Sequence, residues 1–550
     1  MADWETAVAE KKRELATAIP DAWRIPEGAL SGSETKLVAQ DAVRASGVLS
    51  PAELAITEDN TAAQLLAKIA QRELTAVEVT TAFAKRAAVA QQLTSCLTEM
   101  FFERGIERAR WLDEFLEENG RVYGPLHGLP ISLKDSFRVE GIHATAGFVA
   151  LLAERPTSNS ALVDLLLDAG AVLYVKTNIP QTMMTADSEN NIFGRALNPH
   201  NTALTAGGSS GGEGALAALR GAPLGVGTDV AGSIRIPALS CGVYGFKPTP
   251  GRVPFGNQAP GLRSGLPGIA PAAGPLGQSV ADLELFMTAV AAGDPWRYDD
   301  DAVPVPWRPA AHQRRRPAAK LRVGVLPEDP AYPLHPPVRR ALDEAASGLE
   351  AAGHEVIRLP ADPARGVSLA QRIAFQYFGL GGRLYGGHLI EKAGEPLVAS
   401  VAAGSHPFTT EPPVVAAGLE LAQVLERLGA ARGAYSDAWR RTWLEHDLDV
   451  VLAPGAQNTA VAHDTWGLPP YTLMWNLIEY PACIVPFGKA SKELDPEPVT
   501  YGVPFQPDYD PVQVDGAPCA VQIVAPKFKD EECLWAAGII DSSLNAIKVN

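Results

Sequence analysis

Two Gly-rich segments of the sequence place serine side chains beside backbone amides that are free to bind an anion. The first covers residues 207–214 and precedes an Ala- and Leu-rich stretch, and the second covers residues 225–237. A Gly-rich turn before a helix exposes N–H groups, which suit a negatively charged ligand. No Lys follows the glycines as a P-loop requires, and no GxGxxG pattern with a downstream acidic residue is present. Nucleotide binding is therefore disfavoured, and an anionic reaction intermediate is the alternative.

The second segment offers four backbone donors in a row and a nucleophile at their end. Consecutive N–H groups can form a concave nest, here from Val230, Ala231, Gly232 and Ser233. Such a nest stabilises the oxyanion of acyl transfer, where the loss of one donor costs about 3–4 kcal/mol. The small side chains let a substrate carbonyl approach the backbone. We therefore expect an oxyanion hole with the Ser233 hydroxyl as nucleophile.

A nucleophilic serine needs a base, and the histidines do not provide an obvious one. His127 and His143 flank the first apolar strand, but neither stands in a recognisable triad motif. A lysine can act instead where burial disfavours its charged form and lowers its pKa from about 10.4. Lys134 directly follows an apolar run. The pattern alone does not separate it from Lys176 or Lys247, which follow similar runs.

The composition excludes several other classes of protein. The 550 residues carry 47 basic and 63 acidic side chains, a net charge of −16, which argues against a nucleic-acid binder. No stretch approaches the roughly 18 consecutive apolar residues of a membrane span, and residues 1–20 lack the apolar core of a secretory signal. Five cysteines form no CxxC pair, and the histidines form no HExxH motif. We expect a cytoplasmic protein with reduced cysteines, no metal site and no cofactor.

Strands and helices alternate along most of the chain. The pattern predicts helices at residues 61–70, 76–91, 102–118, 160–169, 337–352, 412–445 and 531–547. Thr61 and Thr75 are the expected N-caps of the first two. Apolar runs predict strands at residues 129–133, 171–175, 321–326, 354–359, 450–452 and 482–485. This alternation favours a large α/β domain over residues 61–550, preceded by a helical segment at residues 1–60. A Pro- and Arg-rich connection near residues 295–318, with a basic run at 312–316, reads as a solvated loop.

At these residues the sequence resembles the amidase signature family of serine hydrolases. The resemblance rests on residues 207–212, 227–229, 232–237 and 241–249, which form one continuous signature, and on residues 128–135 upstream. Lys176-Thr177-Asn178, Asn198-Pro199, Trp475-Asn476 and Tyr480-Pro481-Ala482 also fit, so the likeness covers about residues 60–545. The branch looks like fungal acetamidases and fatty acid amide hydrolases. The resemblance implies one large domain whose central mixed β-sheet is covered by helices on both faces.

The resemblance also implies roles for individual residues. Ser233 resembles the nucleophile, Ser209 the bridging serine that the family holds through a cis peptide, and Lys134 the base that starts neutral. Val230, Ala231, Gly232 and Ser233 would supply the oxyanion donors. Ser209 and Met183 fall where the family contacts substrate, although core packing explains Met183 equally well. Many relatives have Gly at the position of Ala231, where a positive φ would strain Ala by roughly 1 kcal/mol.

Neighbouring polar residues are expected to support this site rather than react. Ser210 is interpreted as a hydrogen-bonding support of its loop. Asp229 and Arg235 are interpreted as polar contacts that fix the nest. Cys241 lies eight residues after Ser233 but has no base motif, so we interpret it as a buried structural thiol.

The leading hypothesis is a stand-alone amidase that converts a carboxylic amide to a carboxylate and ammonia or an amine. A small aliphatic amide such as acetamide is the expected substrate, and a fatty acid amide hydrolase-like activity is an alternative. A second alternative is the ammonia-releasing A-type subunit of a tRNA-dependent amidotransferase. A catalytically dead binding scaffold would have lost a triad residue, and all three are present. Because homodimers are common among soluble enzymes, a homodimer is the expected assembly.

Overall fold

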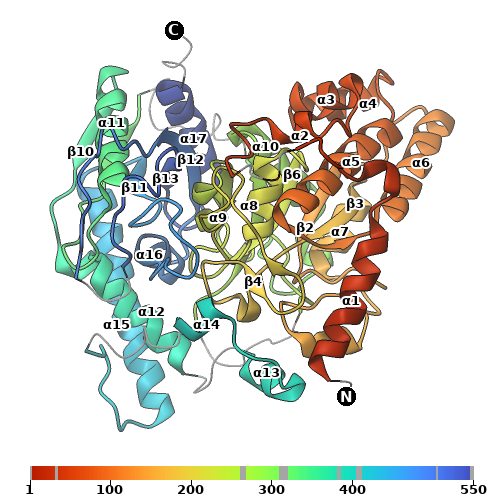
Figure 1. Ribbon diagram of the computed structural model, residues 1–550. Helices are drawn as coiled ribbons and strands as arrows, with labels where there is room; N and C mark the ends of the chain where they lie inside the picture. Colours follow the sequence, from red (N-terminus) through yellow and green to blue (C-terminus); the bar gives the residue numbers. More distant parts are fainter. Residues whose placement is uncertain are drawn as a thin grey trace.

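The computed structural model describes residues 3–545, except 31, 33–34, 260–267, 309–319, 381–385, 404–411 and 503–505 (Figure 1). The basic run at residues 312–316 lies outside the described residues. Within the described part, no helix is long and apolar enough to cross a membrane. The architecture is a single large α/β domain, as the sequence predicted.

One mixed sheet of 11 strands runs through the molecule, in the order β1-β3-β2-β6-β8-β7-β12-β13-β11-β9-β10. The strands of this sheet are β1 (Leu97–Met100), β2 (Pro130–Lys134), β3 (Val172–Thr177), β6 (Leu224–Asp229), β7 (Tyr244–Lys247), β8 (Ala272–Gly277), β9 (Arg322–Val325), β10 (Glu355–Arg358), β11 (Val450–Pro454), β12 (Ala482–Lys489) and β13 (Pro518–Val524). The strands β2, β3 and β6 are parallel neighbours, as are β9, β10 and β11, while antiparallel pairs join these two groups. A separate hairpin pairs β4 (Glu189–Asn190) with β5 (Gly194–Arg195).

Helices cover the sheet on both faces (Figure 1). They are α1 (Trp4–Ala18), α2 (Ala42–Ala45), α3 (Pro51–Glu58), α4 (Ala62–Ala70), α5 (Ala76–Thr94), α6 (Phe102–Asn119), α7 (Ala161–Asp168), α8 (Gly211–Ala218), α9 (Arg235–Ser240), α10 (Val280–Ala292), α11 (Pro336–Ala351), α12 (Val367–Gly379), α13 (Gly387–Ala393), α14 (Ala399–Ala403), α15 (Leu421–Glu445), α16 (Pro470–Leu477) and α17 (Asp530–Asn545). Short 3₁₀ turns are η1 (Asp21–Trp23), η2 (Val149–Ala153), η3 (Gln181–Met183), η4 (Pro295–Arg297) and η6 (Pro363–Arg365).

The strand β7 shows directly that both faces are covered. The hydroxyl of Tyr244 donates to Asp541 of α17 at 2.9 Å. The next residue, Gly245, packs against Ala238 of α9, where a Cβ would meet the alanine Cβ at 2.7 Å. Successive residues of a strand point to opposite faces, so α9 and α17 lie on opposite sides of the sheet.

Local signals set most of the predicted helix ends. Thr61 and Thr75 cap α4 and α5 through capping boxes, in which the threonine hydroxyl and a Gln or Glu three residues later bond each other's backbone N–H. The helix α6 ends at Gly120, which has φ +66°. The prediction of helix over 412–445 is wrong for residues 412–420, because Pro412 and Pro413 cannot continue a helix and Gly418 has φ +85°.

The Gly-rich residues 224–229 form the buried strand β6, which the sequence pattern did not predict. Gly weakens strand propensity, so the apolar alternation is hidden there. The strand forms because it pairs with β2 on one side and with β8 on the other. The pairing of Ser132 with Gly225 and of Leu133 with Val226 brings the carboxyl ends of β2 and β6 side by side. The helices α8 and α9 start beside this edge (Figure 1).

Candidate active site

Lys134 ends the strand β2 and is fully buried. Its Nζ lies 2.6 Å from Ser209 Oγ and 2.8 Å from Thr228 Oγ1. Burial lowers the pKa of Lys134 to about 7, although the negative charges of Asp229 and Glu213 oppose this shift. Among the described residues, Lys134 forms no salt bridge. A lysine in these surroundings is half neutral near pH 7 and can accept a proton.

Ser209 precedes Ser210, the N-cap residue of α8, and is almost completely buried. The peptide bond between Gly208 and Ser209 is cis, as the resemblance implies. Ser188 holds this turn, because its hydroxyl donates to the Gly207 carbonyl at 2.9 Å and accepts from the Gly211 N–H at 3.0 Å. The Ser209 hydroxyl thereby stays within hydrogen-bond reach of Lys134.

Ser233 follows β6 in the turn that leads into α9, and it is partly exposed. Its carbonyl accepts a hydrogen bond from the Ser210 N–H at 3.2 Å, which joins the two serine-bearing turns. Within the described part of the chain, the Ser233 hydroxyl has no hydrogen-bond partner. The hydroxyl is thus accessible to a substrate, while the backbone around it is fixed.

The nest holds three available donors rather than four. The Gly232 N–H, which we expected to face a substrate oxygen, donates to Asp229 Oδ1 at 2.8 Å. The Gly232 N–H is therefore not free in this structure, because a buried carboxylate lies within its reach, and its role as an oxyanion donor stays a prediction. The N–H groups of Val230, Ala231 and Ser233 have no acceptor among the described residues.

The backbone conformation of the nest explains which residues it tolerates. Gly232 has φ +137°, and a Cβ there would lie 2.4 Å from Thr472 Oγ1. Ala231 is not among the residues with positive φ, so alanine fits without strain. Its carbonyl accepts a hydrogen bond from Thr472 Oγ1 at 2.6 Å, which fixes this peptide unit.

The buried ion pair of Asp229 and Arg235 supports the nest. Arg235 donates through Nε to Asp229 Oδ2 at 3.0 Å and through Nη2 to Asp229 Oδ1 at 2.9 Å. Asn476 donates to the same carboxylate at 2.9 Å, and Gln522 accepts from Arg235 at 2.8 Å. Burial alone would raise the pKa of Asp229, but the Arg235 charge and these hydrogen bonds hold it well below its usual range. The expectation that Asp229 and Arg235 fix the nest is confirmed.

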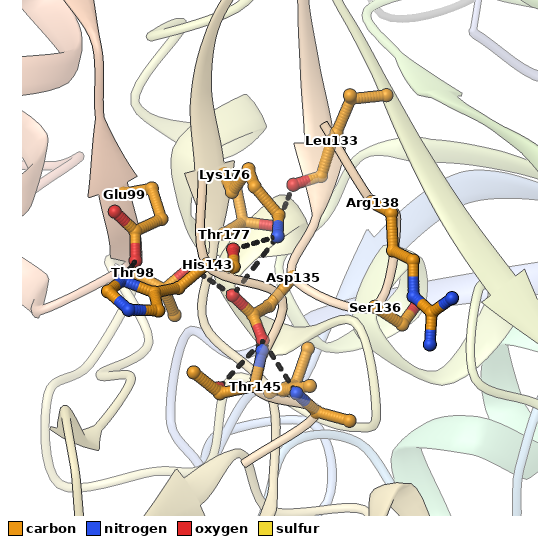
Figure 2. Close-up of polar contacts among 12 residues, drawn as sticks. Thr98, Glu99, Leu133, Asp135, Ser136, Arg138, His143, Thr145, Lys176 and Thr177 are labelled. Atoms are coloured by element: carbon orange, nitrogen blue, oxygen red, sulfur yellow. Dashed lines mark hydrogen bonds and ion pairs between the residues drawn. The ribbon is translucent and has the colours of Figure 1, made fainter. Parts of the chain in front are cut away.

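The structure separates the three lysines that the sequence left open. Lys176 on β3 lies 3.6 Å from Asp135 Oδ1 and donates to the carbonyl of His143. Figure 2 shows Asp135 between Lys176 and Thr145, whose N–H and hydroxyl both donate to Asp135 Oδ2 at 2.8 Å. Among the described residues, Lys247 donates only to the carbonyl of Pro248, at 3.1 Å. Among the three, Lys134 alone contacts a serine.

In the part of the chain that the structure describes, two groups of side chains have the spacing of metal ligands. The first combines Glu14, Glu99 and His143, but the Lys11 ammonium already lies 2.7 Å from Glu99 and 3.0 Å from Glu14. The second is the run 299–301, in which Asp299 already accepts hydrogen bonds from the N–H groups of Phe255 and Gly256. Neither group adjoins Lys134 or Ser209 in the contacts described above.

Comparison with known proteins decides the family. Residues 78–534 match the family model described as Amidase. An amidase of Gibberella moniliformis is 40% identical over 547 residues, which cover 99% of each chain, and an acetamidase of Aspergillus oryzae is 36% identical with 99% of each chain covered. The chain belongs to the amidase signature family. A solved fatty acid amide hydrolase has a TM-score of 0.86 and 30% identity, covering 99% of this chain and 95% of its own. This amidase signature protein is accordingly an amide-hydrolysing enzyme.

Other predicted residues of this amidase signature enzyme behave in different ways. Cys241 is buried, its Sγ lies 3.4 Å from the Ala206 carbonyl, and burial raises its pKa, as expected of a structural thiol. Ser210 supports its loop through the backbone, while its buried hydroxyl has no hydrogen-bond partner in the described part of the chain. Met183 has φ +57° and packs against the apolar cluster of Phe148 and Leu389. Contact of Met183 with a substrate stays a prediction.

Sequence reasoning missed two residues next to the amidase signature lysine. Thr228 supplies the second hydroxyl at Lys134, but it comes from a strand that the pattern did not reveal. Glu213 lies in the first turn of α8 and is buried, although acidic residues are almost never fully buried without partners. The signal that could have identified Glu213 is its position as a single acidic residue within a segment of Gly and Ala residues.

Proposed function

We propose that this amidase hydrolyses small aliphatic carboxylic amides through an acyl-enzyme on Ser233, with Ser209 and Lys134 as proton carriers. The observation that carries the proposal is the 2.6 Å contact between Lys134 Nζ and Ser209 Oγ. Either group can donate in that contact when the amine is neutral, and the depressed pKa of Lys134 makes the neutral form available near pH 7. A serine activated by a positioned base is the requirement for nucleophilic catalysis.

In the proposed first step, a proton moves from Ser233 Oγ to Ser209 Oγ while the Ser209 proton moves to Lys134 Nζ. The Ser233 oxygen bonds to the amide carbon, and the carbonyl π electrons move to its oxygen. The resulting oxyanion would be stabilised by the N–H groups of Val230, Ala231 and Ser233. Gly232 would join only if its hydrogen bond to Asp229 were shared.

In the proposed second step, the Lys134 ammonium returns its proton through Ser209 to the leaving nitrogen. The C–N bond breaks, and ammonia or an amine departs. Water then attacks the acyl-enzyme, and the same relay runs again: the water proton passes through Ser209 to Lys134, and returns to Ser233 Oγ as the acid leaves. No cofactor enters either step.

Ser233→Ala tests the nucleophile. We expect it to abolish covalent labelling by a fluorophosphonate, with the melting temperature close to that of the wild type. Ser210→Ala is the matched control, since its hydroxyl is buried and has no hydrogen-bond partner among the described residues. It should label at the wild-type level. Full labelling of Ser233→Ala would contradict the assignment.

Similarity to acetamidases favours small amides as substrates, and long-chain amides are the second substrate class to test. Acetamidases of Aspergillus oryzae and Emericella nidulans are each 36% identical over nearly their whole length, which supports acetamide-sized acyl groups. The structural similarity to fatty acid amide hydrolase supports a longer acyl chain. The test is kcat/KM measured across primary amides from acetamide to long-chain and aryl amides. A maximum at long chains would overturn the small-amide proposal, and Met183→Ala should then alter the chain-length preference.

The same relatives bear on the partner and the compartment. Proteins named amidase and acetamidase match this chain from end to end, which supports a stand-alone enzyme over an amidotransferase subunit. Full activity of the purified chain without a partner is the expected result. A homodimer and a cytoplasmic location remain part of the proposal, the latter supported by five buried free cysteines. Light scattering and fractionation measure these two.

A further inference from the structure

Glu213 is a fully buried acid in the first turn of α8, and both of its oxygens are occupied by hydroxyl donors. Ser132 Oγ donates to Oε2 at 2.6 Å, and Thr177 Oγ1 donates to Oε1 at 2.8 Å. Among the described residues, Glu213 forms no salt bridge. A buried carboxyl that has hydrogen bonds but no cation is costly in its charged form, so its presence calls for an explanation.

The hydroxyls that hold Glu213 belong to the face of the sheet that carries Lys134. Ser132 stands two residues before Lys134 on β2, so both side chains point to one face. Thr177 is the register partner of Lys134 on β3. On the other side, Gly225 of β6 leaves the space that the carboxyl fills, since a Cβ there would lie 2.0 Å from Glu213 Oε2. Residues of three adjacent strands thus hold this carboxyl on the face of the sheet that carries the lysine, without an ion pair between the two side chains among the described residues.

The proposed reaction creates a charge that the other contacts of Lys134 do not balance. When Lys134 accepts a proton, its ammonium meets the two hydroxyls of Ser209 and Thr228 and, at 3.5 Å, the Thr228 carbonyl. Asp229 is already neutralised by Arg235 at 2.9 Å. Of the two carboxylates whose charge acts on Lys134, Asp229 is paired with Arg235, whereas Glu213 forms no salt bridge with the described residues.

We propose that Glu213 is a positioning residue whose carboxylate is the counter-charge of the Lys134 ammonium. This inference rests on the proposed function, in which Lys134 is the base. Glu213 transfers no proton in the relay and touches no substrate; it favours the protonated form of Lys134 and so sets the pH at which the base becomes neutral.

The electrostatics of the surrounding groups agree with a coupled pair. Burial raises the pKa of Glu213 to about 7, against the hydrogen bonds from Ser132 and Thr177 and the charge of Lys134. Asp229 also acts on the pKa of Lys134, and the charge of Glu213 in turn helps to raise the pKa of Tyr174 and of Cys96. Burial raises the pKa of Tyr174 and of Cys96, so both are neutral near pH 7. The negative charge of Glu213 and the positive charge of Lys134 therefore favour each other.

Glu213→Gln in the full chain tests the proposal. Gln keeps the shape of Glu and can bond both hydroxyls, while it removes the charge. Loss of the negative charge lowers the pKa of Lys134, so the acidic limb of the pH profile of kcat/KM should move to lower pH by about one unit. Glu213→Asp, which keeps the charge, should leave the limb near its wild-type position. A merely structural role would lower the rate without moving the limb.

Two further variants keep the test decisive. Ser132→Ala removes one donor to the carboxylate and should move the limb in the same direction by less, which covers the case in which Glu213→Gln does not fold. Glu531→Gln, a buried acid paired with Arg252 at 2.9 Å, is the matched control and should leave the limb in place. The inference about Glu213 alone is overturned if the acidic limb is lost in Lys134→Met but keeps its wild-type position in Glu213→Gln and Ser132→Ala. Absence of amide hydrolysis, or of Ser233 labelling, in the wild type overturns the proposed function instead.

Discussion

Two buried lysines on neighbouring strands, Lys134 on β2 and Lys176 on β3, meet opposite kinds of partner. Lys134 contacts two hydroxyls and forms no salt bridge with the described residues. Lys176 lies 3.6 Å from Asp135, which also accepts hydrogen bonds from Thr98, Thr145 and the Ala146 N–H. Burial lowers the pKa of both lysines, but at Lys176 the adjacent carboxylate is the largest influence that opposes it.

The difference shows how one sheet gives the same residue type two functions. Lys176 pairs in register with Leu133, while Lys134 pairs with Thr177, so the two lysines point to opposite faces. On one face, hydroxyls can exchange protons with an amine. On the other face, a carboxylate holds an ammonium ion in place. We therefore expect substitution of Lys134 to cost activity and substitution of Lys176 to cost stability.

The largest expected effect is on the rate of Lys134→Met. Removal of a general base lowers kcat/KM by about 10²–10⁴-fold. The melting temperature should stay level or rise, because Met needs no charge desolvation in that site. Steady-state kinetics and thermal unfolding measure the two quantities. A large loss of stability with normal activity would reverse the roles assigned to the two lysines.

Lys176→Met should instead destabilise the fold. It leaves Asp135 buried without its cation, and the loss of one partner from a buried pair costs about 3–5 kcal/mol. Urea unfolding measures this free energy. The double variant Lys176→Met with Asp135→Asn should recover part of it. Activity per folded molecule should fall far less than in Lys134→Met, and an equal fall would remove the contrast.

The pH dependence of kcat/KM in the unmodified enzyme tests Lys134 as the base. Because the pKa of Lys134 is lowered to about 7, the base is protonated below that pH and neutral above it. We expect kcat/KM to fall about tenfold per pH unit below pH 7 and to level off above it. A profile that stays flat through strongly acid pH would exclude a neutral lysine as the base.

The smallest expected effect concerns the buried contacts of Lys11, in α1, with Glu99 and His143. Lys11 of α1 is buried, lies 2.7 Å from Glu99, and its Nζ is 3.3 Å from His143 Nδ1. A double-mutant cycle of Lys11→Met and Glu99→Gln should give a coupling free energy of about 1 kcal/mol. The effect is modest because burial raises the pKa of Glu99 to about 7, so the acid can protonate when its partner is lost. A coupling near zero would show that this contact does not anchor α1.

Much of the fold followed from local signals. The threonine caps of α4 and α5, the Gly120 stop and the apolar runs of β2 and β3 are short-range features, and the structure confirms them. The strand β6 escaped prediction because its glycines give no alternating pattern, and pairing with β2 and β8 creates it. The hydrogen bond from the Gly232 N–H to Asp229 was likewise beyond prediction, since it depends on the geometry of the turn.

The sequence by itself determined which residue types were available for acyl transfer and the order of strands and helices that carries them. It presented Ser209, Ser233 and three lysines after apolar runs, and it presented an acid inside a Gly-rich helix start. Only the tertiary structure decided that Lys134 meets Ser209, 75 residues away, and that Glu213 meets Ser132 and Thr177. The physical reason is that burial and partner charge set the protonation of a lysine, and both depend on strands that are neighbours in the sheet but distant in the chain.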